Sequence, residues 1–408
     1  MKKRYYLIFL ILFLNGCSPV TKNESKKISK VVLVTKERQY TAGDAIVLIF
    51  NIDGVKNLKL VLKNAFGSSV IIGKRIGNNI KYKIPYNYAT KVGSCYWNLI
   101  WNKKELVAGK INIQPNSTKT TIIETYIGPP SIIAGVTDYT MLVTIPTDTY
   151  DNPLEDGTSV AVKHQFENTI TETNVRLKNG IAWENIYSTR KSGRILVSAS
   201  CNRINSKELT TLVFPAKATD FKIEIARVHQ FADGNQVINL ITSKITDEYG
   251  NVVSDGTLVN FIIEDTKGAK LKAIGTILNG VATAKMLHPS EKETWKVTAY
   301  ITGTAKSDEM VVNFETAVED FPVKHSYDHR TITVGPIKSF MQQLIPDGIH
   351  MSCAIYNEKN QLIETKETTS RKGMSSFYLD PDFYKKGSYQ IKINSMGLLK
   401  AYYINLNE

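Results

Sequence analysis

The sequence has little of the chemistry that metal sites and enzyme active sites require. Its 408 residues include only six histidines and four cysteines, which form neither a C-x-x-C nor an H-E-x-x-H pattern. A P-loop and a G-x-S-x-G elbow are also missing. These absences exclude the most common zinc, nucleotide and serine-hydrolase signatures. We therefore predict that the chain is not an enzyme and holds no metal and no dissociable cofactor.

Two clusters of polar residues remain as candidate metal sites. His325 and His329 flank Asp328, and on a helix that spacing could hold zinc. The segment is expected to be a strand, however, in which residues i and i+4 are about 13 Å apart, too far for one ion. Acidic residues around Asp148 and Asp247 suggest calcium, but that ion needs about six to eight oxygens. Turn chemistry is the better interpretation of these aspartates.

Cysteine pairing provides no framework either. Besides Cys17, the chain has Cys95, Cys201 and Cys353, an odd number of residues that are each more than a hundred positions apart. This spacing indicates neither a disulfide nor a zinc site. Cys95 and Cys201 fall on the apolar phase of strand-like runs, so we expect them to be small buried side chains.

A dense run of like charges is also absent. The chain carries a formal net charge of +13, but its lysines and arginines are scattered among strand-like segments. Scattered charge favours a solvated basic surface over a nucleic-acid site. We expect no nucleic-acid partner.

Long apolar runs are scarce, and the longest occupies residues 5–14, directly after Lys2, Lys3 and Arg4. About ten residues are too few to cross a bilayer as a helix. A positive start followed by such a run is typical of a secretory signal peptide. We expect no second membrane segment.

The run ends in Leu-Asn-Gly-Cys at residues 14–17, which resembles the lipobox of bacterial lipoproteins. The resemblance implies a signal peptide at 1–16 and a covalent lipid of palmitate-type chains on Cys17, and several such chains anchor a protein lastingly. Polar, lysine-rich sequence then predicts a flexible tether at 17–30. Because Ser18 rather than Asp follows the cysteine, the resemblance also implies the outer membrane of a Gram-negative bacterium. The alternative is an ordinary signal peptide with a chance cysteine.

Beyond the tether, the apolar stretches are short, rich in Val, Ile, Thr and Tyr, and separated by turn residues. Stretches of about four to eight such residues are typical of all-β sandwiches. An internal repeat gives the module size. DTYDNPLEDGTSVAV from Asp148 aligns without a gap with DEYGNVVSDGTLVNF from Asp247, and NGIA at Asn179 matches NGVA at Asn279. A repeat of about a hundred residues suits a self-contained sandwich.

The repeated segments also predict local structure. Asp-x-Tyr-x-Asn indicates a turn closed by bonds from side chain to backbone, and the Asn-Gly pairs indicate hairpin turns. The two repeats resemble bacterial Ig-like domains of the invasin and intimin type. Residues 247–313 match that pattern closely. Residues 148–214 match less well, since Asp151 stands where the pattern has glycine.

The two ends of the chain resemble each other more than they resemble the repeats. IKYKIPYNYATKVGSCYW from Ile80 and SSFYLDPDFYKKGSYQIK from Ser375 each combine a strand, a turn with Pro and an aromatic residue, and a strand after Gly-Ser. We therefore predict an all-β chain of about four tandem Ig-like β-sandwich modules. The predicted module ranges are 31–115, 116–215, 216–317 and 318–408.

Aromatic residues supply the first candidate contact with a partner. Trp97, Trp101 and Trp295 are in phase with buried neighbours, so we expect them in cores. Trp183 is expected to face out if Ala182 faces in. Glu184 would then point inward, a conflict that a β-bulge could resolve.

The last module supplies the other candidate contacts. Residues 322–408 form the module farthest from the lipid, and we expect the partner to dock there. Arg371, Lys372, Tyr402 and Tyr403 are the candidates, because Arg and Tyr are favoured at interfaces. The prediction is a non-enzymatic envelope lipoprotein that presents a binding or adhesion surface to a protein or glycan. Two alternatives stay open: a structural subunit of an envelope secretion, conjugation or uptake complex, and a carbohydrate-binding surface lipoprotein.

Overall fold

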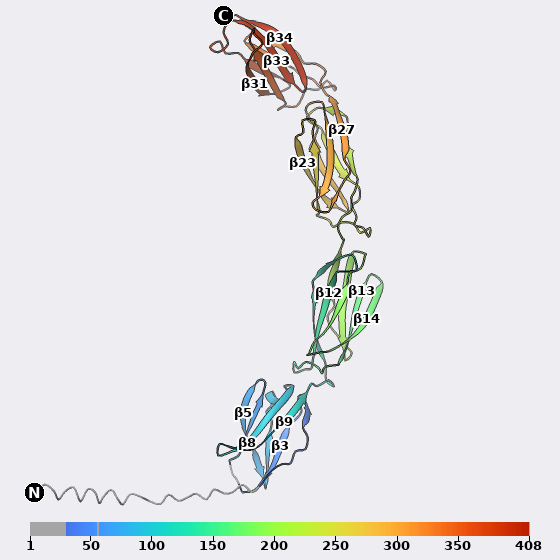
Figure 1. Ribbon diagram of the computed structural model, residues 1–408, viewed down its shortest axis with the longest axis vertical. Helices are drawn as coiled ribbons and strands as arrows, with labels where there is room; N and C mark the ends of the chain where they lie inside the picture. The colour runs from blue at the N-terminus through green and yellow to red at the C-terminus, as the bar shows by residue number, and fades with distance from the viewer. Residues whose placement is uncertain (1–29, 55–56, 408) are drawn as a thin grey trace, which may run out of the picture.

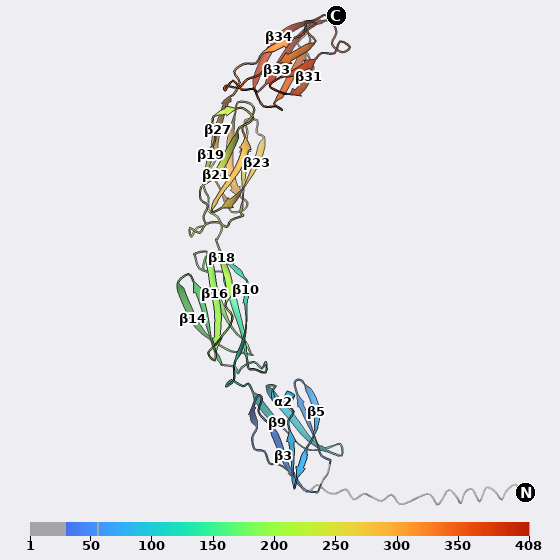
Figure 2. The same cartoon turned by 180° about the vertical axis from the view of Figure 1, so that it is seen from behind.

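The chain folds into four β-sandwiches that follow one another end to end (Figure 1). The structure is a computed structural model and describes residues 30–54 and 57–407. The predicted signal peptide, Cys17 and the tether up to residue 29 lie outside the described residues. Both views show a long, gently curved rod with the C-terminus at the end opposite the first sandwich (Figure 2). Among the described residues, no helix is long and apolar enough to cross a membrane.

The first sandwich contains nine strands and the short helix α2 (Tyr86–Ala89), the one helix within the described residues. Its strands are β1 (Val31–Leu33), β2 (Gln39–Thr41), β3 (Val47–Ile52), β4 (Lys59–Asn64), β5 (Gly67–Ile72), β6 (Lys74–Ile76), β7 (Asn79–Lys83), β8 (Gly93–Trp101) and β9 (Lys104–Gln114). One sheet has the order β1-β3-β7-β6 and the other the order β2-β9-β8-β4-β5. The helix connects the two sheets and buries Tyr88 against the core.

The second sandwich follows the same plan. Its strands are β10 (Ile122–Gly128), β11 (Ser131–Ile133), β12 (Tyr139–Thr147), β13 (Ser159–Phe166), β14 (Thr169–Arg176), β15 (Ala182–Tyr187), β16 (Gly193–Cys201), β17 (Ile204–Asn205) and β18 (Leu209–Phe214). A three-stranded sheet β10-β12-β15 packs on a sheet of the order β11-β18-β16-β13-β14, to which β17 adds a short pairing. In this arrangement β15 is the edge of the smaller sheet.

In the third sandwich the two sheets are continuous. Its strands are β19 (Ile223–Ala226), β20 (Phe231–Ala232), β21 (Val237–Thr242), β22 (Leu258–Glu264), β23 (Lys270–Leu278), β24 (Val281–Leu287), β25 (Glu293–Ile301), β26 (Ala305–Lys306) and β27 (Met310–Thr316). The path runs β19-β21-β24-β23-β22-β25-β27-β20. Strand β23 joins the layers, since it pairs with both β22 and β24.

The fourth sandwich is smaller. Its strands are β28 (Val323–His325), β29 (Thr331–Val334), β30 (His350–Tyr356), β31 (Leu362–Thr369), β32 (Ser375–Tyr378), β33 (Gly387–Ser395) and β34 (Leu398–Leu406). Its sheets have the orders β28-β29-β32 and β31-β30-β33-β34.

The first three sandwiches share a split first strand. Its first part, β1, β10 or β19, pairs antiparallel in one sheet. Its second part, β2, β11 or β20, crosses to the other side and runs parallel to the last strand, β9, β18 or β27. In the described part of the fourth sandwich, no strand runs parallel to β34. The split strand therefore ties the entry of each of the first three sandwiches to its exit.

Alternating apolar side chains fill each sandwich from both sheets. The four cores take their buried members from the four predicted ranges, except that Ala317, assigned to the third module from sequence, is buried in the fourth core. Cys95 and Cys201 are unpaired and buried, as predicted, and so is Cys353.

The predicted repeat is visible as repeated turns. Asn179 and Gly180 have φ angles of 54° and 81°, and Asn279 and Gly280 have φ angles of 52° and 86°. Positive φ at both central residues is the hairpin turn that Asn-Gly favours. The prediction of hairpin turns at these pairs is confirmed.

Candidate functional site

The Asp-x-Tyr-x-Asn stretches fold into loops at the junctions between sandwiches. In the second sandwich, Oδ1 of Asp148 accepts the backbone N–H groups of Tyr150 and Asn152 at 2.8 and 3.1 Å. This bonding closes the turn predicted from the sequence. The other oxygen accepts the N–H of Asn116 in the linker at 3.0 Å. One carboxylate therefore holds both the loop and the chain that enters its sandwich.

Asn152 reaches from this loop into the first sandwich. Its amide nitrogen donates to the carbonyl oxygen of Thr90 at 2.8 Å, and its amide oxygen accepts the N–H of Val92 at 3.1 Å. The ring of Tyr150 lies against Gly43, where a Cβ atom would collide with it. The side chains of one loop thus join two sandwiches.

The same contacts recur between the second and third sandwiches. Oδ2 of Asp247 accepts the N–H of Ala216 in the linker at 2.8 Å. Asn251 donates to the carbonyl oxygen of Arg190 at 2.7 Å and accepts the N–H of Ser192 at 2.8 Å. The ring of the loop tyrosine again lies beside a glycine of the preceding sandwich. We call the two sets the junction clamps: Asp148, Tyr150 and Asn152, and Asp247, Tyr249 and Asn251.

Both clamp aspartates are buried and charged. Burial alone would raise the pKa of Asp148, but hydrogen bonds from Asn116, Asn152 and Tyr150 outweigh it and hold the pKa below its ordinary value. The same balance lowers the pKa of Asp247. Because the protein's own N–H groups occupy these carboxylates, turn chemistry rather than calcium explains them.

The junction between the third and fourth sandwiches is built differently. The N–H of Ser339 donates to the carbonyl oxygen of Gln343 at 2.8 Å, as the N–H of the clamp aspartate does to its asparagine carbonyl. Serine offers no carboxylate here. Instead, Phe340 of this loop stacks on Phe231 of the third sandwich, with ring centroids 4.0 Å apart. Phe340 also meets the ring of His229 at 5.1 Å. Aromatic packing therefore replaces the clamp.

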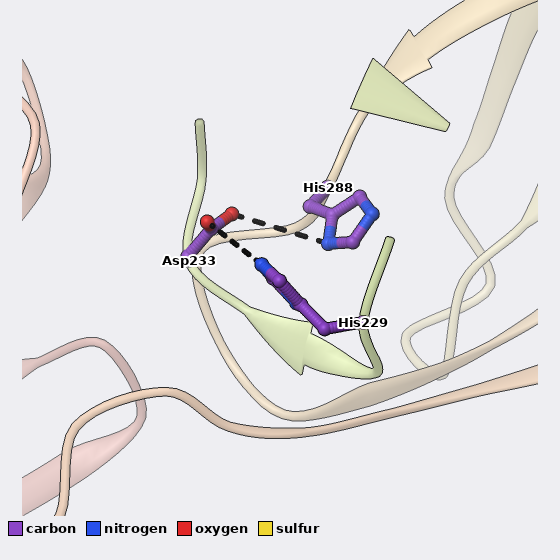
Figure 3. A group of neighbouring side chains, drawn as sticks. All are labelled: His229, Asp233 and His288. Carbon is purple, nitrogen blue, oxygen red and sulfur yellow. Dashed lines mark ion pairs between the residues drawn. The ribbon is translucent and has the colours of Figure 1, made fainter. Parts of the chain in front are cut away.

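Beside this stack, three ionisable side chains come together: His229, Asp233 and His288 (Figure 3). Nε2 of His229 lies 3.4 Å from one carboxylate oxygen of Asp233, and Nδ1 of His288 lies 3.9 Å from the other. The side chain of His288 is 0% exposed. Two histidines and a carboxylate can bind a transition metal only if nitrogen lone pairs face the centre.

The backbone of Phe231 fixes the protons of this cluster. Its N–H donates to Nδ1 of His229 at 3.1 Å, so the proton of neutral His229 sits on Nε2 and faces Asp233. Its carbonyl oxygen lies 2.9 Å from Nδ1 of His288, which must therefore carry a proton. Both nitrogens that face the carboxylate carry hydrogen. The two histidines are therefore held by hydrogen bonds to the Phe231 backbone rather than to the carboxylate, because Nε2 of His229 has no hydrogen-bond partner and Nδ1 of His288 is 3.9 Å from Asp233. Burial keeps His288 neutral by lowering its pKa.

The distance expected between His325 and His329 is wrong. The two rings stack nearly parallel with centroids 5.8 Å apart. Strand β28 ends at His325, and a turn closed by Ser326 and Thr331 brings the second histidine back. Burial, reinforced by His329, lowers the pKa of His325. The absence of a metal at this pair stays a prediction.

Trp183 faces solvent, with 54% of its surface exposed. The pairing of β12 with β15 is continuous, with Val143 opposite Trp183 and Leu142 opposite Glu184. The expected bulge is therefore absent. Glu184 is on the inward side, but its place on an edge strand leaves it partly exposed.

The predicted basic contacts lie at an unexpected end of the fourth sandwich. Arg371 and Lys372 are exposed in a tight turn, and the N–H of Lys372 donates to Asp347 at 2.6 Å. The neighbouring Ile349 lies against Gly234 of the third sandwich. The turn is therefore near the junction rather than at the free end of the rod.

Only one of the two predicted tyrosines is at the surface. Tyr403 is 74% exposed, whereas Tyr402 packs against the core and its hydroxyl is buried. Burial raises the pKa of Tyr402. Consecutive strand residues point to opposite faces, so the pair could not both be exposed. The sequence-based expectation of two surface tyrosines is wrong for Tyr402.

Sequence reasoning missed the histidine cluster and the reach of the clamps across the junctions. His288 is far from His229 in the sequence, and pairing of β21 with β24 brings it close. The Asn-Gly turn predicts only the pairing of β23 with β24, so no local sequence signal indicates this one. For the clamps, the available signal was the repetition of the same asparagine in both repeats, between β12 and β13 and between β21 and β22.

The four sandwiches, the first three with split first strands, make this chain a tandem Ig-like β-sandwich protein. Among the protein-family models and the curated proteins, nothing matches it. Similar solved structures include FdeC, an Escherichia coli adhesin, at 14% identity over 70% of this chain and 96% of that chain, with a TM-score of 0.48. Invasin, a bacterial integrin-binding protein, aligns at 11% identity over 93% and 79%, with a TM-score of 0.43. The ICAM-5 D1–D4 fragment aligns at 8% identity over 92% and 98%, with a TM-score of 0.35.

Proposed function

We propose that this chain is a non-enzymatic lipoprotein of a bacterial envelope that presents a binding or adhesion surface on a rod of four sandwiches. The lipid is on Cys17, ahead of the first sandwich, and the membrane is the outer membrane of a Gram-negative bacterium. The partner is a protein or a glycan outside the anchoring membrane.

The observation that carries this proposal is the extended course of a chain whose junctions are held by specific contacts. A nine-residue strand such as β33 is about 30 Å long at about 3.4 Å per residue. Four sandwiches in line therefore extend about 120 Å. The clamps at two junctions and the aromatic stack at the third oppose collapse of this rod. Such a shape carries a surface away from the membrane, as adhesion requires.

A structural role in an envelope complex is the second candidate, because a rod with fixed junctions also serves as a strut. Protease treatment of intact cells separates the two. An adhesin is removed from the surface, and deleting its gene lowers adhesion of the cells to protein-coated or glycan-coated supports. A strut is protected and crosslinks to one partner at fixed stoichiometry. Protection from protease together with unchanged adhesion would reject the adhesion proposal.

A further inference from the structure

The outward face of the sheet β10-β12-β15 carries aromatic side chains in register. Tyr126, Val143 and Trp183 form one row across the three strands. Tyr139 lies opposite Tyr187 four residues along the same two strands, and the centroids of their rings are 5.5 Å apart. We call this surface the aromatic face: Tyr126, Tyr139, Met141, Val143, Trp183, Asn185 and Tyr187.

These rings are exposed together rather than singly. Tyr126 is 59% exposed and Tyr187 56% exposed, close to the value for Trp183. Scattered exposed apolar residues are normal, but contiguous ones indicate an interaction site. The same strands could have carried polar residues on this face without loss to the core, since the inward residues alone fill it.

A polar group lies between the two aromatic rows. Asn185 stands between Trp183 and Tyr187 on the outward side of β15, and Met141 is its partner across the sheet. The amide oxygen of Asn185 is buried and has no hydrogen-bond partner within the protein. A buried acceptor without a donor is unfavourable. A ligand hydroxyl would supply the missing donor once the side chains that cover this oxygen shift.

The size of the face favours a small ligand. The outer strands of a three-stranded sheet are about 10 Å apart, and five residues of β12 cover about 17 Å. The area of the face, which is the product of these two lengths, is well below the roughly 800 Å² that each partner of a stable protein complex buries. A second copy of the chain or a folded protein therefore has too little surface here for a stable complex.

The chemistry of the face favours a neutral sugar. Aromatic rings stack on the C–H faces of sugar rings, while amide and phenol groups bond to sugar hydroxyls. The face itself has no charged member. Glu124, two residues before Tyr126 on β10, lies next to it and accepts a hydrogen bond from the Tyr126 hydroxyl at 3.2 Å. Without lysine or arginine among its members, the face offers nothing to balance sulfate or uronate groups.

We propose that the aromatic face binds a short neutral oligosaccharide. Trp183 and Tyr187 stack on sugar rings, and Asn185 accepts a hydrogen bond from a hydroxyl between them. This inference deepens the proposed function by naming the class of ligand. Its biological role rests on the proposed function, but the binding itself does not.

The test uses the full-length chain in detergent on an array of neutral oligosaccharides, followed by titration of the best ligand. We expect Trp183→Ala and Tyr187→Ala each to weaken binding at least tenfold, and Asn185→Ala to weaken it several-fold. Tyr378→Ala is the matched control, because Tyr378 is 55% exposed on β32 of the fourth sandwich, and it should change affinity less than twofold. Unchanged circular dichroism shows that each variant is folded, as expected for exposed strand positions.

An array without a neutral ligand, or binding that survives both aromatic substitutions, overturns the proposal. The proposal is also overturned if protease treatment of the ligand preparation abolishes binding at this face while glycosidase treatment does not. The ligand would then be a peptide. The proposed function is judged separately by adhesion after gene deletion. If deletion lowers adhesion while Trp183→Ala does not, adhesion stands and this assignment fails.

Discussion

Replacing Asn251 with alanine should weaken the third sandwich and loosen its junction with the second. The side chain makes three hydrogen bonds: to the carbonyl of Arg190, from the N–H of Ser192, and to the carboxylate of Asp247 at 2.8 Å. The first two cross the junction. The third helps to keep a buried carboxylate charged.

The magnitude follows from these bonds. A neutral hydrogen bond contributes about 0.5–1.5 kcal/mol net, and one to a charged group about 1.5–3 kcal/mol. Water can replace part of the loss at the partly exposed Ser192. We therefore expect the free energy of unfolding of the third sandwich to fall by about 2–3 kcal/mol. For a domain of about 100 residues this corresponds to a decrease of roughly 10 °C or more in the melting temperature.

Hydrogen exchange followed by mass spectrometry resolves the effect sandwich by sandwich. Amides of β22 and β25 should lose protection, while those of β4 and β8 in the first sandwich stay unchanged. Small-angle X-ray scattering should show a broader range of end-to-end distances. Asn260→Ala is the control, because Asn260 bonds only to exposed Thr302 in the same sandwich at 3.2 Å and should cost less than about 0.5 kcal/mol. If Asn251→Ala costs no more than the control and leaves scattering unchanged, the clamp does not hold the junction.

Three further predictions follow from the other sites. Phe340→Ala should let the fourth sandwich move relative to the third without unfolding it, because the stack on Phe231 is lost. Small-angle X-ray scattering should then show a broader range of end-to-end distances, and an unchanged profile would argue against a stacked junction. Lowering the pH from about 7 to 5.5 should destabilise the third sandwich. Burial lowers the pKa of His288 in the folded state, whereas the histidine of the unfolded chain titrates near its ordinary value of about 6.5 and therefore binds a proton that the folded chain does not. Hydrogen-exchange protection should fall, and it should fall less in His288→Asn; an equal fall in both proteins would indicate that other groups are responsible. Cys17→Ala should abolish labelling by radioactive palmitate and membrane retention, and a labelled variant would refute the lipid anchor.

Much of the fold was predictable because it depends on local patterns. Asn179-Gly180 and Asn279-Gly280 need positive φ angles that few other pairs accept, so the turn type follows from the residues. The inward phase of Trp295 follows from strand alternation, and the residue is 1% exposed. The hundred-residue repeat then gave the module length.

The contacts across the junctions were not predictable, because their partners come from different modules. Asn152 donates to the carbonyl of Thr90 and accepts the N–H of Val92, about sixty residues earlier, and nothing in the local sequence marks those backbone groups as its partners. The predicted distance between His325 and His329 was wrong for a local reason. The predicted separation of about 13 Å assumes one extended strand, whereas the turn after β28 folds the segment back on itself. Tyr402 illustrates a third limit, since the choice of which of two adjacent tyrosines faces the core depends on strand register.

The split first strands have a mechanical consequence. A pull along the rod draws the entry and exit of a sandwich apart, and in the first three sandwiches those ends lie on parallel, hydrogen-bonded strands such as β11 and β18. Such a pull loads these bonds in shear and all at once, so resistance to force depends on the barrier to unfolding rather than on equilibrium stability. In the proposed arrangement, force acts only between the lipid anchor and the point where the partner binds. A partner gripping the second sandwich would leave the third and fourth slack, while one gripping the tip would put all four under tension.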